Sequence, residues 1–462
     1  MSALSAKIFA ARAVGELARR AGRGGGTSLP GKVLMRLAPG AIAELGSRLP
    51  RGSVILSATN GKTTTAAMIA SVLDGAGISL VHNRAGANMA GGVASTLLAA
   101  ARPGGGIDGE LGLFEVDEFW LESVTEELKP RAVLLSNLFR DQLDRYGELE
   151  TIADRWAAVV GSLPPAARLA LNADDPLIAD LGRDRTDVVY FGVQDPSVAM
   201  PEMQHASDSK HCRRCGAAYV YDVVYLGHLG VYRCPSCGAE RPAPAVAAER
   251  IALDGTRGSS FDLVTPLGRA RVELPLPGLY NVYNALGAAA LCLSLEVPLK
   301  VVVAGLAGVR AAFGRAERIA IGDVELQVLL IKNPAGANEI LRTLVIEPGE
   351  LDLLAVLNDR TADGRDVSWV WDADFEVLAD RVRRVTCAGT RAAELAVRLK
   401  YAGVPSERLH VVPAVAAALD EAVADAPSGR LYALPTYTAL LELRGVLADR
   451  GQAVPFWEPA PV

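Results

Sequence analysis

Short runs of valine, isoleucine and leucine alternate with segments of helical periodicity in the first part of the chain. The runs are mostly apolar without a regular alternation of polar residues, which is typical of a parallel strand whose two faces are both covered by helices. The runs lie at residues 54–56, 79–81, 112–116, 132–137 and 169–172. The pattern therefore predicts an α/β domain built on a parallel sheet.

A second set of apolar runs follows near the C-terminus, at residues 326–331, 353–357, 384–388 and 430–434. It predicts a separate doubly wound, Rossmann-like α/β domain. A chain of 462 residues is also long enough for two or three domains. We therefore predict a lead-in over residues 1–50, a central domain over residues 51–318 and a C-terminal domain over residues 319–462.

The lead-in begins with apolar residues at helical spacing, which predicts a helix over residues 1 to about 20. Its other positions include Lys7, Arg12, Arg19 and Arg20. Such a helix either lies on an anionic membrane surface or docks on its own protein. A glycine-rich break follows, and residues 27–50 are expected to be a short connection.

The loop between the first apolar run and its helix carries the sequence Ser-Ala-Thr-Asn-Gly-Lys-Thr-Thr-Thr at residues 57–65. A strand, a tight loop and a helix in this order form a phosphate site, because loop N–H groups and the positive helix end face the anion. Lys62 is expected to reach the β- and γ-phosphates, and the Thr63 hydroxyl to ligate Mg²⁺. Leu56 stands where the first glycine of the full phosphate-loop pattern belongs. The predicted nucleotide-binding residues are Thr59, Asn60, Gly61, Lys62, Thr63 and Thr64.

Polar residues also follow the other predicted strands, at the carboxyl ends where such folds bind ligands. Glu115 lies near the end of the third run and occupies the place of a Mg²⁺-binding, water-organising carboxylate. A solvated acidic loop is the alternative there. Asn137 ends the fourth run and Asp141 follows it, where a plain helix start is the alternative, and Asn172 ends the fifth.

Four cysteines interrupt the α/β rhythm as two Cys-x₂-Cys pairs, Cys212 with Cys215 and Cys234 with Cys237. Four thiolates at this spacing form a closed tetrahedral Zn²⁺ site. No ligand position remains open for a substrate, so the metal is expected to be structural. The pattern predicts a zinc ribbon inserted at about residues 205–243.

Two later segments carry further candidate side chains. Asn281 and Asn284 lie three residues apart on one face of a predicted helix, where they either bind a purine edge or cap the helix. The loop at residues 358–369 follows a predicted strand and contains Asp359, Asp363 and Asp366. Its position makes it a candidate site, although Asp and Gly also mark ordinary turns.

Charge and hydropathy argue against a nucleic-acid-binding protein and against a membrane-spanning one. The chain has 47 basic and 53 acidic residues, a net charge of −6, which gives no electrostatic reason to expect nucleic acid. No apolar run approaches the roughly 20 residues that span a bilayer, and Lys7 and Arg12 interrupt the region where a signal peptide would need to be apolar. We therefore expect no transmembrane segment and a cytoplasmic location.

The order of the motifs, together with the four-cysteine insert, resembles the Mur ligase superfamily. Within it, the chain is most similar to the ligase-like subunits of lipid II isoglutaminyl synthases, from about residue 30 to 445. The segments that carry the resemblance are residues 59–65, 114–118, 137–147, 172–176, 280–284, 313–318, 332–336, 358–364, 368–372 and 434–438.

The resemblance implies a Mur ligase-type central domain with an inserted Cys₄ zinc ribbon, followed by a Rossmann-like domain. It also implies an ATP-dependent carbon–nitrogen ligase of peptidoglycan synthesis, which amidates the D-glutamate α-carboxylate of lipid II through an acyl phosphate. Lys62 would hold phosphate charge, Thr63 and Glu115 would hold Mg²⁺, and Arg315 would lie by the phosphates. Asn172, Asn281 and Asn284 would face adenine or ribose.

The resemblance further implies a separate GatD-like glutaminase, because no glutaminase nucleophile constellation is visible in this chain. An aspartate among Asp359, Asp363 and Asp366 would complete that partner's Cys–His pair. The lipid-linked substrate would bring the complex to the inner face of the membrane.

Departures from the superfamily pattern leave two other hypotheses. Ala58 replaces a common glycine, Gln142 stands where amino-acid-adding Mur ligases typically carry His, and about 50 residues are too few for their uridine-nucleotide domain. A Mur or folylpolyglutamate-type ligase that joins an amino acid is one alternative. A zinc-ribbon P-loop protein that binds nucleic acid is the other, and tight, salt-dependent binding would identify it.

Overall fold

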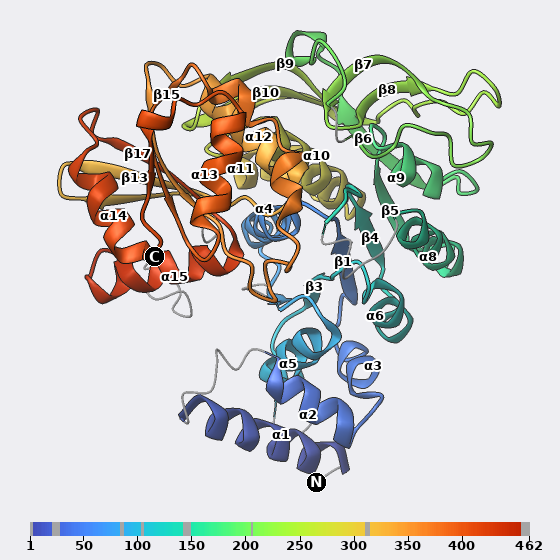
Figure 1. Cartoon of the computed structure of the whole chain (residues 1–462). Helices are drawn as coiled ribbons and strands as arrows, with labels where there is room; N and C mark the ends of the chain where they lie inside the picture. The colour runs from blue at the N-terminus through green and yellow to red at the C-terminus, as the bar shows by residue number, and fades with distance from the viewer. Residues whose placement is uncertain are drawn as a thin grey trace.

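A computed structural model describes residues 3–20, 28–83, 87–102, 106–141, 149–204, 207–309 and 315–453. These residues form a nine-stranded sheet, a six-stranded sheet and a two-stranded hairpin. Figure 1 shows the N-terminal helices at one end of the molecule, with the C-terminal domain in orange and red beside the central domain.

The N-terminal and central parts contain α1 (Ala3–Arg20), α2 (Leu29–Leu37), α3 (Ala41–Gly46), β1 (Ser53–Ser57), α4 (Lys62–Gly75), β2 (Leu80–His82), α5 (Ala90–Ala100), β3 (Leu111–Glu115), α6 (Leu121–Leu128), β4 (Ala132–Leu135), α8 (Leu149–Ser162), β5 (Arg168–Asn172), α9 (Pro176–Leu181), β6 (Val188–Val193), η1 (Pro196–Val198), β7 (Val220–Leu226), β8 (Leu229–Arg233), β9 (Val246–Asp254), β10 (Gly258–Thr265), β11 (Gly268–Leu274), α10 (Leu279–Ser294) and α11 (Leu299–Ala307). The C-terminal part contains β12 (Arg315–Ile321), β13 (Val324–Leu329), α12 (Pro334–Val345), β14 (Leu351–Val356), η2 (Ser368–Trp371), η3 (Phe375–Leu378), β15 (Val382–Ala388), α13 (Ala392–Tyr401), η4 (Ser406–Arg408), β16 (Leu409–Val411), α14 (Val415–Ala424), β17 (Arg430–Pro435) and α15 (Tyr437–Asp449).

The central sheet has the strand order β11-β10-β9-β6-β5-β4-β1-β3-β2. Its strands are parallel from β2 to β9, and β10 and β11 continue it as antiparallel strands. Alternate residues of β1 enter different cores: Val54 and Leu56 pack with α4 and α10, whereas Ile55 packs with α3 and α5. The predicted parallel sheet with two covered faces is confirmed.

The sequence prediction missed β6 and β9 to β11. In β10, Phe261 and Leu263 belong to the apolar core, whereas Asp262 between them pairs with Arg250 and Arg271. This alternation is typical of an antiparallel strand with one face on the core and the other in solvent. Continuous apolar runs are typical of strands that are buried on both faces, so they do not mark a strand of this kind.

The C-terminal sheet has the order β12-β13-β17-β14-β15-β16, with only β12 and β13 antiparallel. Its four predicted strands are all present, and β14 again divides its side chains between two cores. The first strand of this sheet starts at Arg315, slightly before the boundary predicted at residue 319. Strands β12 and β16 were not predicted.

The N-terminal region contains more structure than the predicted connection. The helix expected over residues 1–20 is present as α1, which buries Ile8 and Ala11 against the protein. Arg12 of α1 donates to the carbonyl of Leu98 at 2.7 Å. Residues 29–46, however, form α2 and α3, and α2 packs closely on α5. Within the described residues, no helix combines the length and apolarity that crossing a bilayer requires.

Gly31 explains why α2 approaches α5 so closely. Its N–H donates to the Ser95 hydroxyl at 2.8 Å, and a Cβ atom placed on it would lie 1.9 Å from the Gly91 carbonyl oxygen. A side chain at this position therefore cannot fit without separating the helices.

We predict that Gly31→Ala lowers the free energy of unfolding by about 2 kcal/mol through overpacking. Gly161→Ala in α8 is the matched control, because no atom lies within 4 Å of a Cβ atom there. The control should be neutral or stabilising by up to about 1 kcal/mol. Urea unfolding measures both variants, and equal effects would contradict the proposed close contact.

Candidate active site

The loop between β1 and α4 has the geometry that an anion site requires. Gly61 is the N-cap of α4 and has a φ of +87°, a conformation that favours glycine. A Cβ atom at Gly61 would lie 2.0 Å from Oδ1 of Asn284. Glycine is therefore required here both by the backbone and by its neighbour on α10.

Asn137 holds this loop from the end of β4. Its Oδ1 accepts the N–H of Asn60 at 2.9 Å, and its Nδ2 donates to the Asn60 carbonyl at 3.0 Å. The backbone carbonyl of Asn137 also accepts the N–H of Thr59 at 3.0 Å. Asn137 lies outside any helix, so it supports the loop rather than starting a helix.

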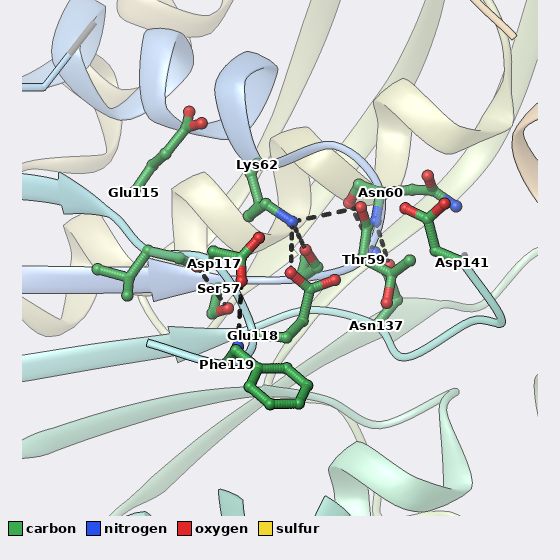
Figure 2. A network of polar contacts seen from close by, with 12 residues as sticks. Ser57, Thr59, Asn60, Lys62, Glu115, Asp117, Glu118, Phe119, Asn137 and Asp141 are labelled. Carbon is green, nitrogen blue, oxygen red and sulfur yellow. Dashed lines mark hydrogen bonds and ion pairs between the residues drawn. The ribbon is translucent and has the colours of Figure 1, made fainter. Parts of the chain in front are cut away.

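Lys62 lies inside the loop, where Figure 2 shows it among oxygen atoms. Its Nζ is 2.9 Å from Oε2 of Glu118 and also donates to the Ala58 carbonyl. Burial opposes the charged amine, but the carboxylates of Glu118, Asp117 and Glu115 outweigh it and raise the pKa of Lys62. Burial likewise opposes ionisation of Glu118, but Lys62 and Lys332 together lower the Glu118 pKa. Both groups are therefore charged at neutral pH.

Thr63 and Glu115, the two predicted Mg²⁺ ligands, lie side by side. The Thr63 hydroxyl is 3.2 Å from Oε1 of Glu115. The buried Asn83 fixes the Glu115 backbone, because it accepts the Glu115 N–H at 2.9 Å and donates to the Glu115 carbonyl at 2.8 Å. A hydroxyl and a carboxylate at the end of a strand are suitable ligands for Mg²⁺. Asn83 directly follows the short strand β2 and was not among the predicted site residues.

The C-terminal domain meets the loop through Lys332 and Asn333. Asn333 and Asn60 exchange side-chain hydrogen bonds, at 3.0 Å from Asn333 Nδ2 and 3.3 Å from Asn60 Nδ2. Lys332 pairs with Asp141 and donates to the Thr59 carbonyl at 3.3 Å. Asn333 also caps α12, since its Oδ1 accepts the Gly336 N–H. Both residues lie in a segment that carried the family resemblance, but no site role was predicted for them.

A cavity lies beside the loop where the two domains meet. Asn284 lines it and accepts a hydrogen bond from the Thr65 hydroxyl at 3.2 Å. Asn281 does not line the cavity, but its Oδ1 accepts a hydrogen bond from Asn284 Nδ2 at 3.0 Å. Its own amide donates to the Pro277 carbonyl rather than capping the helix. The cavity walls comprise Asn60, Gly61, Thr64, Asn137, Phe139, Leu226, Leu229, Tyr280, Tyr283, Asn284, Leu329, Leu330, Lys332, Ala335, Gly336, Glu339 and Ile340.

Like Asn281, the predicted nucleotide ligands Asn172 and Arg315 are not brought to this cavity by described contacts. Asn172 is fully buried at the end of β5, where its Oδ1 accepts the Asp174 N–H at 3.0 Å, and it does not line the cavity. Arg315 opens β12, but its side chain lies outside the described residues, as do Gln142 and residues 310–314. Their predicted roles stay predictions.

The three candidate aspartates of the C-terminal loop have different surroundings. Asp363 is buried and accepts from the N–H and hydroxyl of Thr438, which positions the start of α15. Asp366 is exposed, accepts the Ser368 N–H at 2.8 Å and lines a polar cleft that also contains Lys332. Asp359 is 27 % exposed and accepts from Thr390 and Arg391 at 2.8 Å each. Hydrogen bonding to Thr390 and Arg391 lowers the Asp359 pKa.

The four cysteines converge as the spacing predicted. All four sulfur atoms lie within 4.8 Å of one another, with Cys212 3.6 Å from Cys237 and Cys215 3.5 Å from Cys234. Tetrahedral ligands at a Zn–S distance of about 2.3 Å lie roughly 3.8 Å apart, so the arrangement fits a zinc ion. Two turns with the same hydrogen bonds present the thiols, one ending at Gly216 and the other at Gly238.

Comparisons with known proteins agree with this architecture. The family model of the Mur ligase middle domain matches residues 57–233, and the model of the MurT ligase C-terminal domain matches residues 330–440. Among solved structures, a pseudomurein peptide ligase type C from Methanothermus fervidus has a TM-score of 0.68 and 22 % sequence identity, covering 88 % of this chain and 80 % of that chain. This likeness confirms the Mur ligase fold.

Two relatives are similar over most of their length. Subunit MurT of the glutamine-hydrolysing lipid II isoglutaminyl synthase from Streptococcus pneumoniae is 31 % identical over 92 % of this chain and 93 % of that protein. The subunit of the same name from Staphylococcus aureus is 32 % identical over 84 % of this chain and 86 % of that protein. The chain therefore belongs to the Mur ligase superfamily and, within it, to the MurT family.

Proposed function

We propose that this chain is the ATP-dependent subunit of a glutamine-hydrolysing lipid II isoglutaminyl synthase. It would convert the α-carboxylate of D-glutamate in the lipid II stem peptide into the amide of D-isoglutamine. The observation that carries this proposal is the phosphate loop, with Lys62, Thr63 and Glu115 gathered at the sheet edge that faces the C-terminal domain. Membership of the MurT family supports the choice of substrate.

The chemistry explains why such a loop is needed. A carboxylate is a poor electrophile, so one of its oxygens first attacks the γ-phosphorus of ATP. The bond from that phosphorus to the bridging oxygen breaks, ADP leaves and an acyl phosphate remains. Ammonia then attacks the acyl carbon, the bond to the phosphate oxygen breaks, and inorganic phosphate leaves. The nitrogen loses a proton to solvent or phosphate and becomes a carboxamide.

The residues of the loop stabilise the charge that develops in this transfer. Backbone N–H groups at the start of α4 would bind the phosphates, and the Lys62 ammonium, kept charged by Glu118, would compensate their negative charge. Thr63 and Glu115 would hold Mg²⁺, which would neutralise phosphate oxygens when bound. The nucleoside would occupy the adjoining cavity beside Asn284.

The carboxylate substrate would enter the polar cleft next to this cavity. The cleft contains the cations Arg140 and Lys332, which pair with Asp208 and Asp141. Four aspartates also line the cleft, Asp141, Asp363, Asp366 and Asp372, so an anionic substrate would have to lie against the two cations, which their paired carboxylates keep in place. The lipid-linked substrate would bring the complex to the inner face of the membrane.

Ammonia would come from a GatD-like glutaminase, because the amine is mostly protonated at neutral pH and cannot attack in that form. Asp359 is the best candidate to complete the partner's Cys–His pair. Asp363 is used internally by Thr438, and Asp366 faces the chain's own cleft. Asp359 is ionised, as a carboxylate that orients a histidine must be, and it is exposed enough for a partner chain to reach, while Arg391 holds it in place.

The cysteine cluster would hold a structural Zn²⁺. All four ligand positions are thiolates, so the ion would join the two cysteine turns rather than bind substrate. Its contribution would be to the stability of the ribbon.

The assay that tests the proposed function uses the purified chain with its glutaminase, lipid II, ATP and Mg²⁺. Glutamine and ammonium chloride should each support formation of a carboxamide, which mass spectrometry detects. Asp359→Asn should lose most glutamine-dependent amidation and retain ammonia-dependent amidation, whereas Asp366→Asn should not separate the two. If the chain instead joins a free amino acid to its substrate, the proposed function is wrong.

Lys62→Met should lower turnover at least 10²-fold, on the order expected for loss of a charge-stabilising group. It should also lower the free energy of unfolding by roughly 3 kcal/mol, because Glu118 is left buried and unpaired. Adding Glu118→Gln should recover much of the stability without recovering turnover. Steady-state amidation rates and urea unfolding measure the two effects, and a fully active Lys62→Met enzyme would exclude the assigned phosphate site.

Zinc analysis of the purified chain should find one ion per molecule. Cys212→Ser with Cys234→Ser should abolish zinc binding and lower the melting temperature, because the ribbon loses its central contact. His211→Ala is the control, since His211 is exposed beside Cys212 and should not affect the metal. A metal-free wild-type protein of unchanged stability would refute the structural zinc site.

A further inference from the structure

The zinc ribbon carries a hairpin whose tip lies on the central domain. Strands β7 and β8 are joined by Gly227 and His228, and the flanking Leu226 and Leu229 are buried. These two leucines belong to the same apolar core as α4, the helix that follows the phosphate loop. Gly227 has a φ of +56°, and a Cβ atom there would lie 2.9 Å from the Phe139 ring. The tip therefore fits closely against the segment that follows β4.

Buried polar contacts fix the tip in this place. His228 is fully buried, with its Nε2 3.3 Å from Oδ2 of Asp175 and its ring centroid 4.6 Å from that of Phe139. Asp175 also accepts the Leu138 N–H at 2.9 Å, so one carboxylate holds the tip and the segment beneath it. Burying two ionisable groups is costly unless they are paired, which makes this contact specific.

The neighbouring Asp174 also holds the hairpin. Its backbone carbonyl accepts the Gly230 N–H at 2.9 Å, and its Oδ1 accepts from Arg241 at 2.7 Å, where the chain leaves the ribbon. Its Oδ2 accepts the Tyr283 hydroxyl at 2.6 Å. Tyr283 lines the cavity beside the phosphate loop, so one buried carboxylate joins the ribbon to the cavity wall.

The tip also contacts the C-terminal domain across this cavity. Arg342 of α12 donates to the Tyr225 carbonyl at 2.8 Å and pairs with Glu339 at 2.9 Å. Leu226 and Leu229 of the ribbon line the cavity together with Ile340 and Ala335 of α12. Apolar side chains from both domains in a cavity that adjoins a phosphate loop suit a flat aromatic ring.

We propose that the tip of the zinc ribbon forms one wall of the pocket for the nucleotide base. Leu226 and Leu229 supply the apolar surface, and His228 is a positioning residue that holds them through Asp175. The inserted ribbon thus takes part in nucleotide binding in addition to its structural zinc site. This inference rests on the proposed use of ATP.

The test measures binding of a non-hydrolysable ATP analogue with Mg²⁺ to the full chain in complex with its glutaminase, by calorimetry. Leu229→Ala and Leu226→Ala should each weaken binding about 3- to 10-fold, through loss of apolar contact with the base. Val223→Ala is the matched control, because Val223 packs in the same hairpin core but does not line the cavity. It should leave the affinity unchanged.

Binding of inorganic tripolyphosphate, which has no base, distinguishes the loss of a contact with the base from a general distortion of the nucleotide site. The affinity for tripolyphosphate should be the same in the wild type and both leucine variants. His228→Ala should raise the KM for ATP with little change in kcat, and His228→Gln, which keeps a polar group near Asp175, should recover part of the loss. Zinc content and melting temperature identify variants that fail to fold.

The outcomes separate this inference from the proposed function. If the leucine variants bind the analogue as tightly as the wild type does, the ribbon is not part of the base pocket. The same conclusion holds if the variants lose affinity for tripolyphosphate as much as they lose affinity for the analogue. If the wild type does not bind the analogue, the assigned ATP site itself is wrong, and the inference falls with it.

Discussion

The ion pair between Lys62 and Glu118 is the interaction on which the rest of the site depends. A buried ammonium is unfavourable unless carboxylates and carbonyl groups replace the water it loses. Glu118 supplies the carboxylate, and the Ala58 carbonyl supplies a further acceptor. The backbone of Glu118 is in turn held by Trp156 of α8, whose Nε1 donates to the Glu118 carbonyl at 3.2 Å. Helix α8 thus positions Glu118, and Glu118 in turn keeps the Lys62 ammonium inside the phosphate loop.

Neutral amides make several other connections around the loop, beside the charged Lys332, which donates to the Thr59 carbonyl. Asn83, Asn137 and Asn333 each donate and accept, so each can join two backbone segments or two domains without adding a charge. A carboxylate at these positions would repel the phosphates and would compete with them for the N–H groups of the loop. The reciprocal amide pair between Asn60 and Asn333 is also the kind of domain contact that can separate without leaving an unpaired buried charge.

The parts of this structure that the sequence predicted are those that depend on local patterns. Continuous apolar runs identified the strands buried on both faces, and the spacing of Cys212 to Cys237 predicted a four-thiolate cluster that the structure confirms. Thr63 and Glu115 were placed together because parallel strands end at one edge. What the sequence could not supply were contacts between distant segments, such as His228 with Asp175. A lone histidine in a hairpin turn gives no local signal of its partner. Asn137 showed the same ambiguity, because only the tertiary fold distinguishes a loop support from a helix start.

The departures from the common phosphate-loop pattern follow from the same contacts. Leu56 is the last apolar residue of β1 and is fully enclosed in the core, so the strand continues where the full motif would begin its loop. Ala58 is buried without a left-handed backbone, and it contributes its carbonyl group to Lys62, which any residue can do. Gly61 differs from both, since its backbone is left-handed and a side chain would strike Asn284. The loop therefore keeps glycine at the position where geometry demands it, and Asn137 supplies support from outside the loop.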